Sequence, residues 1–149
     1  MTSSQLDAVT LLAREDEAGV YRADEDAARV AFNAAATLGY NAYRIDLGLA
    51  TDKNSLLRLF GRSLHFPEWY GENWDALIDC LTDLSWEEAD GYVLILQRTD
   101  VLRQTDPSTI DTFYEVLRDA AATWRDTGVP MWVLIISEDG ALRPFEARG

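Results

Sequence analysis

Two uninterrupted apolar runs constrain the fold of this chain more than any other feature. Residues 92–96 read YVLIL and residues 131–136 read MWVLII. A strand without polar alternation is typical of a parallel sheet that helices cover on both faces. Both runs are far shorter than the roughly 20 apolar residues that a membrane-spanning helix needs. The runs therefore predict two buried strands of a small parallel sheet.

Helical periodicity surrounds these runs. Because apolar residues recur at three- and four-residue intervals, we expect helices over residues 24–38, 52–64, 73–86 and from 107 to near 128. Asp24, Asn73 and Asp106 are suited to cap the starts of three of these helices. A short strand is expected over residues 43–47, where apolar and polar residues alternate. Strands that alternate with helices predict an α/β domain with a small parallel sheet.

Net charge and cysteine content limit the partners and the compartment. The net charge of −13 disfavours direct contact with nucleic acid or an anionic membrane, and it favours a basic protein partner. A single cysteine, Cys80, excludes an internal disulfide and fits a reducing compartment. The N-terminus lacks the basic start and the long apolar core of a secretory signal. We therefore expect a cytoplasmic protein.

The acidic residues are concentrated in one block. No lysine or arginine lies between Ser63 and Gln97, a window that contains Glu68, Glu72, Asp75, Asp79, Asp83, Glu87, Glu88 and Asp90. On a helical wheel of residues 73–86, the apolar side consists of Trp74, Leu77, Leu81 and Leu84. The opposite side carries Asp75, Asp79 and Asp83. Like charges at this spacing each cost about a few tenths of a kcal/mol. The acidic ridge formed by Asp75, Asp79 and Asp83 therefore does not help the helix to fold.

Three kinds of site could use such a ridge. A divalent metal would need further ligands, and no second acidic cluster or histidine set completes a shell, so no metal or cofactor is expected. Paired-carboxylate catalysis would need a cleft and one carboxyl with a raised pKa, whereas a solvated helix face provides neither. A docking surface for a basic protein fits better, because Trp69 and Tyr70 lie beside the charges. His65 and Cys80 are interpreted as structural residues.

The segment FPEWYGENWDALIDCLTD, residues 66–83, resembles the signature of the barstar family, intracellular inhibitors of microbial guanyl-specific ribonucleases. The match is ungapped from Pro67 to Thr82. The flanking elements extend the resemblance to residues 42–137 and imply a three-stranded parallel sheet packed against helices. Residues 1–41 then form an N-terminal extension with one predicted helix, packed on the main domain. Residues 138–149 form a C-terminal tail, and we expect both ends, 1–18 and 138–149, to be loosely held.

The resemblance also implies roles for individual residues. Asp79 is similar to the central carboxylate that meets the phosphate-binding groups of the enzyme, Asp75 to a second paired carboxylate, and Asp119 to a further ion-pairing acid. Trp69 replaces a tyrosine that packs on the catalytic groups. The remaining partner-binding positions are Tyr70, Asn73, Trp74, Ile78, Thr82, Asp83 and Leu84. Ile78 and Leu84 stand where the reference inhibitor has tryptophans, and Asp83 where it has a glycine, so the surrounding shape differs.

The resulting functional hypothesis is a non-enzymatic inhibitor of a basic microbial ribonuclease. Its carboxylates would occupy the places of RNA phosphates in the active site. The inhibitor would be a monomer before binding. It would neutralise the ribonuclease, a toxin, in the cytoplasm of a bacterial cell. Two alternatives remain open: an immunity protein for another nuclease toxin, and a barstar-like structural or regulatory interaction module.

Overall fold

A computed structural model describes residues 2–146 of the chain, and its centre is a four-stranded parallel sheet. The strand order is β1-β4-β3-β2. The strands are β1 (Val20–Ala23), β2 (Asn41–Asp46), β3 (Tyr92–Gln97) and β4 (Met131–Ile136). The two apolar runs form the central strands β3 and β4, which pair with each other over Tyr92↔Met131 to Leu96↔Ile135. The prediction of a parallel sheet is confirmed, with four strands in place of three.

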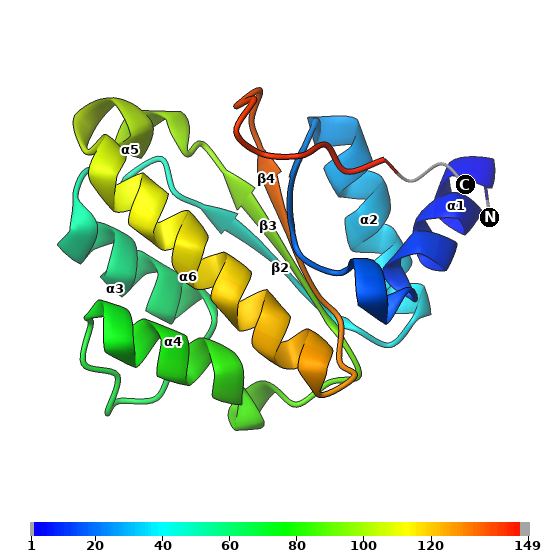
Figure 1. The fold of residues 1–149 in the computed structure, drawn as a ribbon, viewed down its shortest axis with the longest axis horizontal. Coiled ribbons are helices and arrows are strands. Elements are labelled where there is room, and N and C mark those ends of the chain that lie inside the picture. Colours follow the sequence, from blue (N-terminus) through cyan, green and yellow to red (C-terminus); the bar gives the residue numbers. More distant parts are fainter. Residues whose placement is uncertain (1, 147–149) are drawn as a thin grey trace.

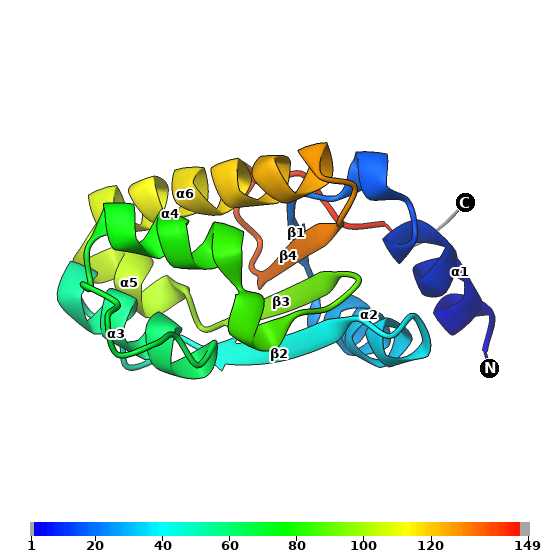
Figure 2. The same cartoon turned by 90° about the horizontal axis from the view of Figure 1, so that it is seen from below.

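Helices cover both faces of this sheet (Figures 1 and 2). One face carries α1 (Ser3–Leu12) and α2 (Glu25–Thr37). The other face carries α3 (Lys53–Ser63), α4 (Trp74–Asp83), α5 (Asp100–Thr105) and α6 (Pro107–Asp126). Within the described chain, no helix has both the length and the apolar character that a membrane crossing requires.

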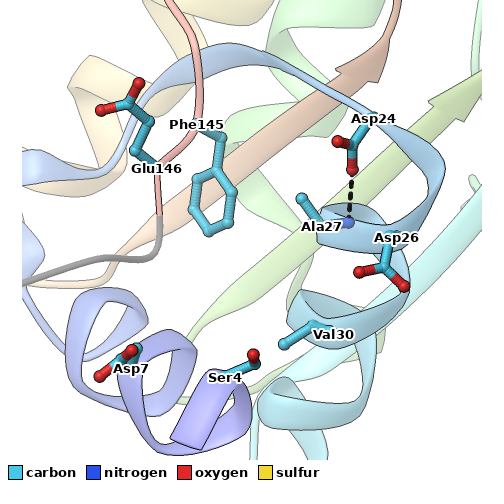
Figure 3. A pocket seen from close by; sticks show the side chains of 8 residues that line it. All are labelled: Ser4, Asp7, Asp24, Asp26, Ala27, Val30, Phe145 and Glu146. Carbon is cyan, nitrogen blue, oxygen red and sulfur yellow. Dashed lines mark hydrogen bonds between the residues drawn. The ribbon is translucent and has the colours of Figure 1, made fainter.

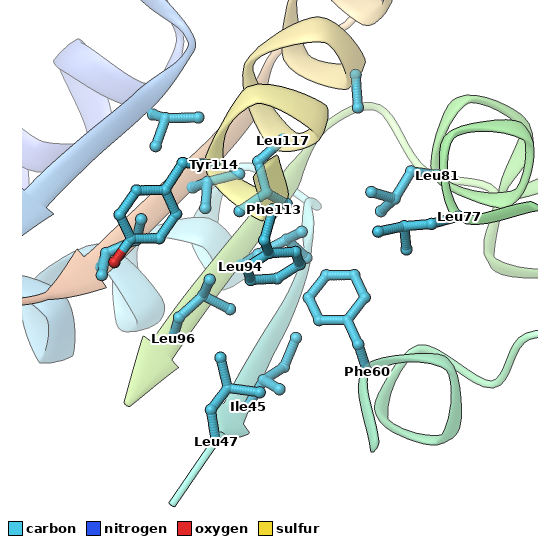
Figure 4. Packing of buried hydrophobic residues seen from close by; sticks show 14 of the residues in the cluster. Ile45, Leu47, Phe60, Leu77, Leu81, Leu94, Leu96, Phe113, Tyr114 and Leu117 are labelled. Atoms are coloured by element: carbon cyan, nitrogen blue, oxygen red, sulfur yellow. The ribbon is translucent and has the colours of Figure 1, made fainter. Parts of the chain in front are cut away.

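Two hydrophobic cores explain why the central strands lack polar residues. Leu94 and Leu96 of β3 join Val133 of β4 in the core beneath α3, α4 and α6 (Figure 4). Val93 and Ile95 point to the opposite face and pack with Trp132 beneath α1 and α2. Because successive strand residues alternate between faces, a sheet with two cores needs apolar residues at every position.

Side-chain caps begin five of the helices. In α1 the Thr2 hydroxyl accepts from the Gln5 N–H at 3.2 Å. The side chains of Asp24, Asp52 and Asn73 accept hydrogen bonds from the backbone N–H groups of residues 27, 55 and 76, and that of Asp106 does the same for residue 109. Each bond satisfies one of the N–H groups that a helix start leaves without a partner. The caps at residues 24, 73 and 106 are those that the sequence predicts.

The strand that the sequence analysis missed is β1. It has four residues, VYRA, and lies at the edge of the sheet, parallel to β4. The C-terminal segment covers its outer side: the N–H of Arg22 donates to the carbonyl of Arg143 at 2.8 Å, and the N–H of Phe145 donates to the carbonyl of Arg22 at 2.8 Å. A strand this short lacks the repeated alternation that would identify it in a sequence.

The expectation of loosely held ends is wrong for the described residues. In α1, Ala8 and Leu12 are fully buried, and the indole N–H of Trp132 donates to the Leu12 carbonyl at 3.1 Å. Near the other end, Leu142 and Phe145 are buried. The segment before residue 42 therefore contributes α1, β1 and α2, not one helix, to the layers of the domain.

Candidate protein-binding site

The acidic helix α4 lies against α6 (Figures 1 and 2) and buries one side. Leu77, Cys80 and Leu81 are fully buried, and the indole N–H of Trp124 in α6 donates to the Leu81 carbonyl at 2.7 Å. The opposite side, formed by Asp75, Asp79 and Asp83, is exposed. We call these three residues the acidic face. Its position agrees with the helical wheel.

The charges of the acidic face are uncompensated within the described molecule. None of the ion pairs among residues 2–146 involves Asp75, Asp79 or Asp83. Other carboxylates do pair with arginines. Arg98 pairs with Asp46, and Arg103 pairs with Asp111 at 2.8 Å and with Asp139 at 3.0 Å. The three carboxylates therefore present negative charge directly to solvent.

The loop before α4 carries an exposed aromatic residue, Trp69, and a partly buried one, Tyr70. Trp69 is 63% exposed, and its ring meets Trp86 edge to face at 6.2 Å. Tyr70 points inward instead, and its hydroxyl donates to the Leu57 carbonyl at 3.0 Å. Tyr70 fits because Gly61 lacks a Cβ, which would lie 2.6 Å from the tyrosine ring. Trp69 is thus available for contact, while Tyr70 supports the loop.

The other predicted contact residues have local tasks as well. Asn73 caps α4 through its side-chain oxygen, 2.8 Å from the Ala76 nitrogen. The hydroxyl of Thr82 donates to the Ile78 carbonyl at 2.7 Å. Ile78 and Thr82 are partly exposed, and Asp119 is exposed on α6, the helix that packs on α4.

Trp74 acquires a neighbour that the sequence analysis did not identify. Lys53, at the start of α3, places its Nζ 6.0 Å from the centre of the Trp74 ring. A cation over an indole face is attracted by the ring. The two residues are 21 positions apart in the chain, so the basic-free window gives no sign of this lysine. Lys53 adds one positive charge beside the start of the acidic helix.

Leu84 is not a surface residue, contrary to its predicted place among the partner contacts. It is 1% exposed and packs in the core with Leu77 and Leu81. The expected helix over 73–86 ends at Asp83 because Leu84 adopts a left-handed backbone with φ of 48°, and a short 3-10 helix follows over Ser85–Glu87. This turn directs the leucine side chain inward, where burial offsets the backbone cost of about 1–2 kcal/mol.

Cys80 and Glu87 are held by the fold. Burial, together with the nearby carboxylates of Asp79 and Asp83, raises the pKa of the Cys80 thiol to about 11. Glu87 is paired with His65, and its side chain is 23% exposed. Its backbone carbonyl accepts from the Asn41 side chain at 2.9 Å. A buried thiol agrees with the structural interpretation of Cys80, and the Glu87 carboxylate is only partly exposed.

Hollows in the surface lie elsewhere. One of about 490 Å³ is bounded by α1, the start of α2 and the C-terminal segment, with Asp7, Asp24, Asp26 and Glu146 in its lining (Figure 3). Others of about 380 and 620 Å³ lie beside β1 and beyond the ends of β3 and β4. None of these three is lined by a residue of α4. Among residues 2–146, no group of three or more His, Cys, Asp or Glu side chains could hold a metal ion.

The fold and this surface define an α/β protein with an exposed acidic helix and, in the loop before it, an exposed aromatic residue. The family model described as Barstar (barnase inhibitor) matches residues 40–136, so the chain belongs to the barstar family. The search of curated proteins found no match. Members of the family are inhibitors and not enzymes, and they bind ribonucleases as protein partners. The resemblance noted in the sequence is confirmed.

Proposed function

We propose that this protein inhibits a basic microbial ribonuclease by inserting its acidic face into the active site of the enzyme. The carboxylates of Asp75 and Asp79 would stand where the RNA phosphates bind, and Trp69 would pack on the catalytic groups. The observation that carries the proposal is the set of three exposed carboxylates without an ion-pair partner among residues 2–146. The inhibitor would act as a monomer in the cytoplasm.

The physical basis is electrostatic complementarity. A ribonuclease active site is a basic groove that must attract phosphates, and a negative helix is attracted by the same field. Arginines of an enzyme can bind each carboxylate through two parallel N–H groups. Because α4 is fixed to α6 before binding, little side-chain and backbone entropy would be lost on association.

The partner need not be the enzyme that other family members bind. Asp83 extends the acidic face by one turn, and Lys53 places a positive charge beside Trp74. A groove that fits this protein should therefore accept a third carboxylate and tolerate a lysine near the start of α4. Specificity among related partners arises from such matches and mismatches around a shared centre.

The test is an RNA-cleavage assay with a panel of basic microbial ribonucleases and, in parallel, a DNA-cleavage assay with basic deoxyribonucleases. The wild type is expected to inhibit at least one ribonuclease. Asp79→Ala should weaken that inhibition by about two to three orders of magnitude. Complexes of this family are among those from which this magnitude is known. Asp7→Ala, an equal loss of charge in α1 on the other side of the sheet, is the matched control and should inhibit normally.

Two results would reject the proposal. Inhibition of deoxyribonucleases alone would identify an immunity protein for another toxin. Absence of inhibition across both panels, with the protein folded, would favour an interaction module that has no nuclease target.

A further inference from the structure

A group of arginines gathers beside the edge strand β1, in contrast to the acidity of the whole chain. A hollow of about 380 Å³ is lined by Gly19, Val20, Arg118, Arg125, Ala141, Leu142 and Arg143. We call it the arginine pocket. Its residues come from three separate parts of the chain: the start of β1, the second half of α6 and the C-terminal segment. Among residues 2–146, no acidic residue lines it.

Neutral partners hold the guanidinium groups of Arg125 and Arg143 in place. Arg125 donates through Nη1 to the Ala18 carbonyl at 2.7 Å. The guanidinium of Arg143 lies 4.3 Å from the centre of the Tyr21 ring. It also lies over Gly19, where a Cβ would be 2.9 Å from Arg143 Nη2. Gly19 therefore leaves the space that Arg143 occupies, and each contact leaves several N–H donors unused.

The arginines of the pocket lack an ion-pair partner in the part of the chain that the structure describes. Among residues 2–146, no ion pair within 4.0 Å involves Arg118, Arg125 or Arg143. The nearby Glu17 carboxylate lies 3.6 Å from Arg14 instead. In a chain with 26 acidic and 13 basic residues, three arginines line one hollow, and they repel one another because no carboxylate of residues 2–146 forms an ion pair with them. A bound anion would relieve it.

We propose that the arginine pocket binds the phosphate group of a small molecule. Guanidinium forks match the oxygen geometry of phosphate, and a phosphate dianion can accept from several of them at once. Val20 and Leu142, both buried, add apolar lining to the pocket, and the ring of Tyr21 lies 4.3 Å from the Arg143 guanidinium. The site is separate from the acidic face, because the pocket lies beside β1 whereas α4 packs on another side of α6.

The proposal is tested by calorimetric titration of the full chain with inorganic phosphate, with sodium chloride adjusted to keep ionic strength constant. The wild type should bind with a saturable isotherm and one site per chain. Arg118→Gln should weaken binding by about tenfold or more, because Arg118 is exposed and loses only its contribution to the ligand. Arg62→Gln, which removes an exposed arginine of α3 outside the pocket, is the matched control and should bind as the wild type does.

Further arms identify the source of the phosphate and guard against unfolding. A nucleoside monophosphate should bind at least as tightly as phosphate, whereas the nucleoside without phosphate should not bind. Arg118→Gln should keep the wild-type melting temperature in chloride and its normal ribonuclease inhibition, which separates this test from that of the proposed function. Non-saturable heats equal to those of chloride, or unchanged binding in an Arg118→Gln/Arg143→Gln variant, would overturn the proposal.

Discussion

The indole N–H of Trp124 donates a 2.7 Å hydrogen bond to the carbonyl oxygen of Leu81, and this bond joins the end of α4 to α6. The Leu81 carbonyl belongs to the last turn of α4, where helix geometry leaves carbonyls without a partner. Trp124 thus fixes the end of the helix that carries the acidic face. Its ring also packs on Tyr92 with a centroid distance of 5.2 Å.

Trp124→Phe should therefore destabilise the domain. The variant keeps most of the aromatic packing but removes the donor, which leaves the Leu81 carbonyl unsatisfied at a cost of about 1–3 kcal/mol. Denaturant titration measures this loss. If the free energy of unfolding stayed unchanged, the bond would not hold the helix end.

Asp79→Asn should not lower stability. The carboxylate of Asp79 has no ion-pair partner among residues 2–146, and it lies one helical turn from Asp75 and from Asp83. Removal of one charge from this row relieves repulsion of about a few tenths of a kcal/mol. Denaturant titration should therefore give a free energy of unfolding equal to or slightly above that of the wild type. A clear decrease would mean that Asp79 has a structural task.

Asp79 and Glu88 should affect binding kinetics differently. Glu88 is exposed, so Glu88→Gln should mainly slow association, and high salt should abolish its effect. Asp79→Ala should mainly speed dissociation, because it would leave basic groups of the enzyme buried and unpaired. Surface-binding kinetics at two salt concentrations distinguish the two cases. If Asp79→Ala altered only the association rate, the proposal that Asp79 inserts into a groove of the enzyme would be wrong.

Leu84→Ala tests the assignment of this residue to the core. Truncation of a buried leucine costs about 2–5 kcal/mol of stability, whereas loss of a surface contact would leave stability nearly unchanged. We expect a large decrease in the free energy of unfolding and near-normal affinity for the ribonuclease under native conditions. The opposite pattern, weak binding in a fully stable protein, would show that Leu84 belongs to the interface and not to the core.

Cys80 should react slowly in the native protein. Burial raises its pKa to about 11, and the thiolate is the reactive form, so little thiolate exists near neutral pH. Alkylation by iodoacetamide should be slow in the folded state, increase with pH towards that value, and become fast in denaturant. Mass spectrometry of the alkylated fraction provides the measurement. Rapid alkylation of the native protein at neutral pH would contradict the buried position.

Cys80→Ala should leave inhibition nearly intact. The substitution removes one buried sulfur atom, so a modest loss of roughly 1 kcal/mol in the free energy of unfolding is expected. An inhibition assay on the folded variant checks the functional part. Abolished inhibition would reveal a role for the thiol beyond packing.

Local patterns in the sequence determined the central strands, three of the helix caps and the acidic face. Each depends on residues close in the chain: the unbroken apolar runs of β3 and β4, Asn73 followed by an amphipathic helix, and carboxylates at four-residue spacing. Periodicity alone places Asp75, Asp79 and Asp83 on the side of α4 opposite Leu77 and Leu81. The same segment was sufficient to suggest the family.

The tertiary structure alone decided the features that depend on distant contacts. The edge strand β1 exists because β4 and the C-terminal segment pair with its two sides, and four residues carry no periodic signal. The left-handed turn at Leu84 ends α4 and starts the short 3-10 helix over Ser85–Glu87, which a helical wheel continued to residue 86 cannot represent. Arg125 reaches Ala18 across 107 positions of the chain. Such juxtapositions follow from the packing of whole elements, so the sequence predicts the acidic face but not the arginine pocket.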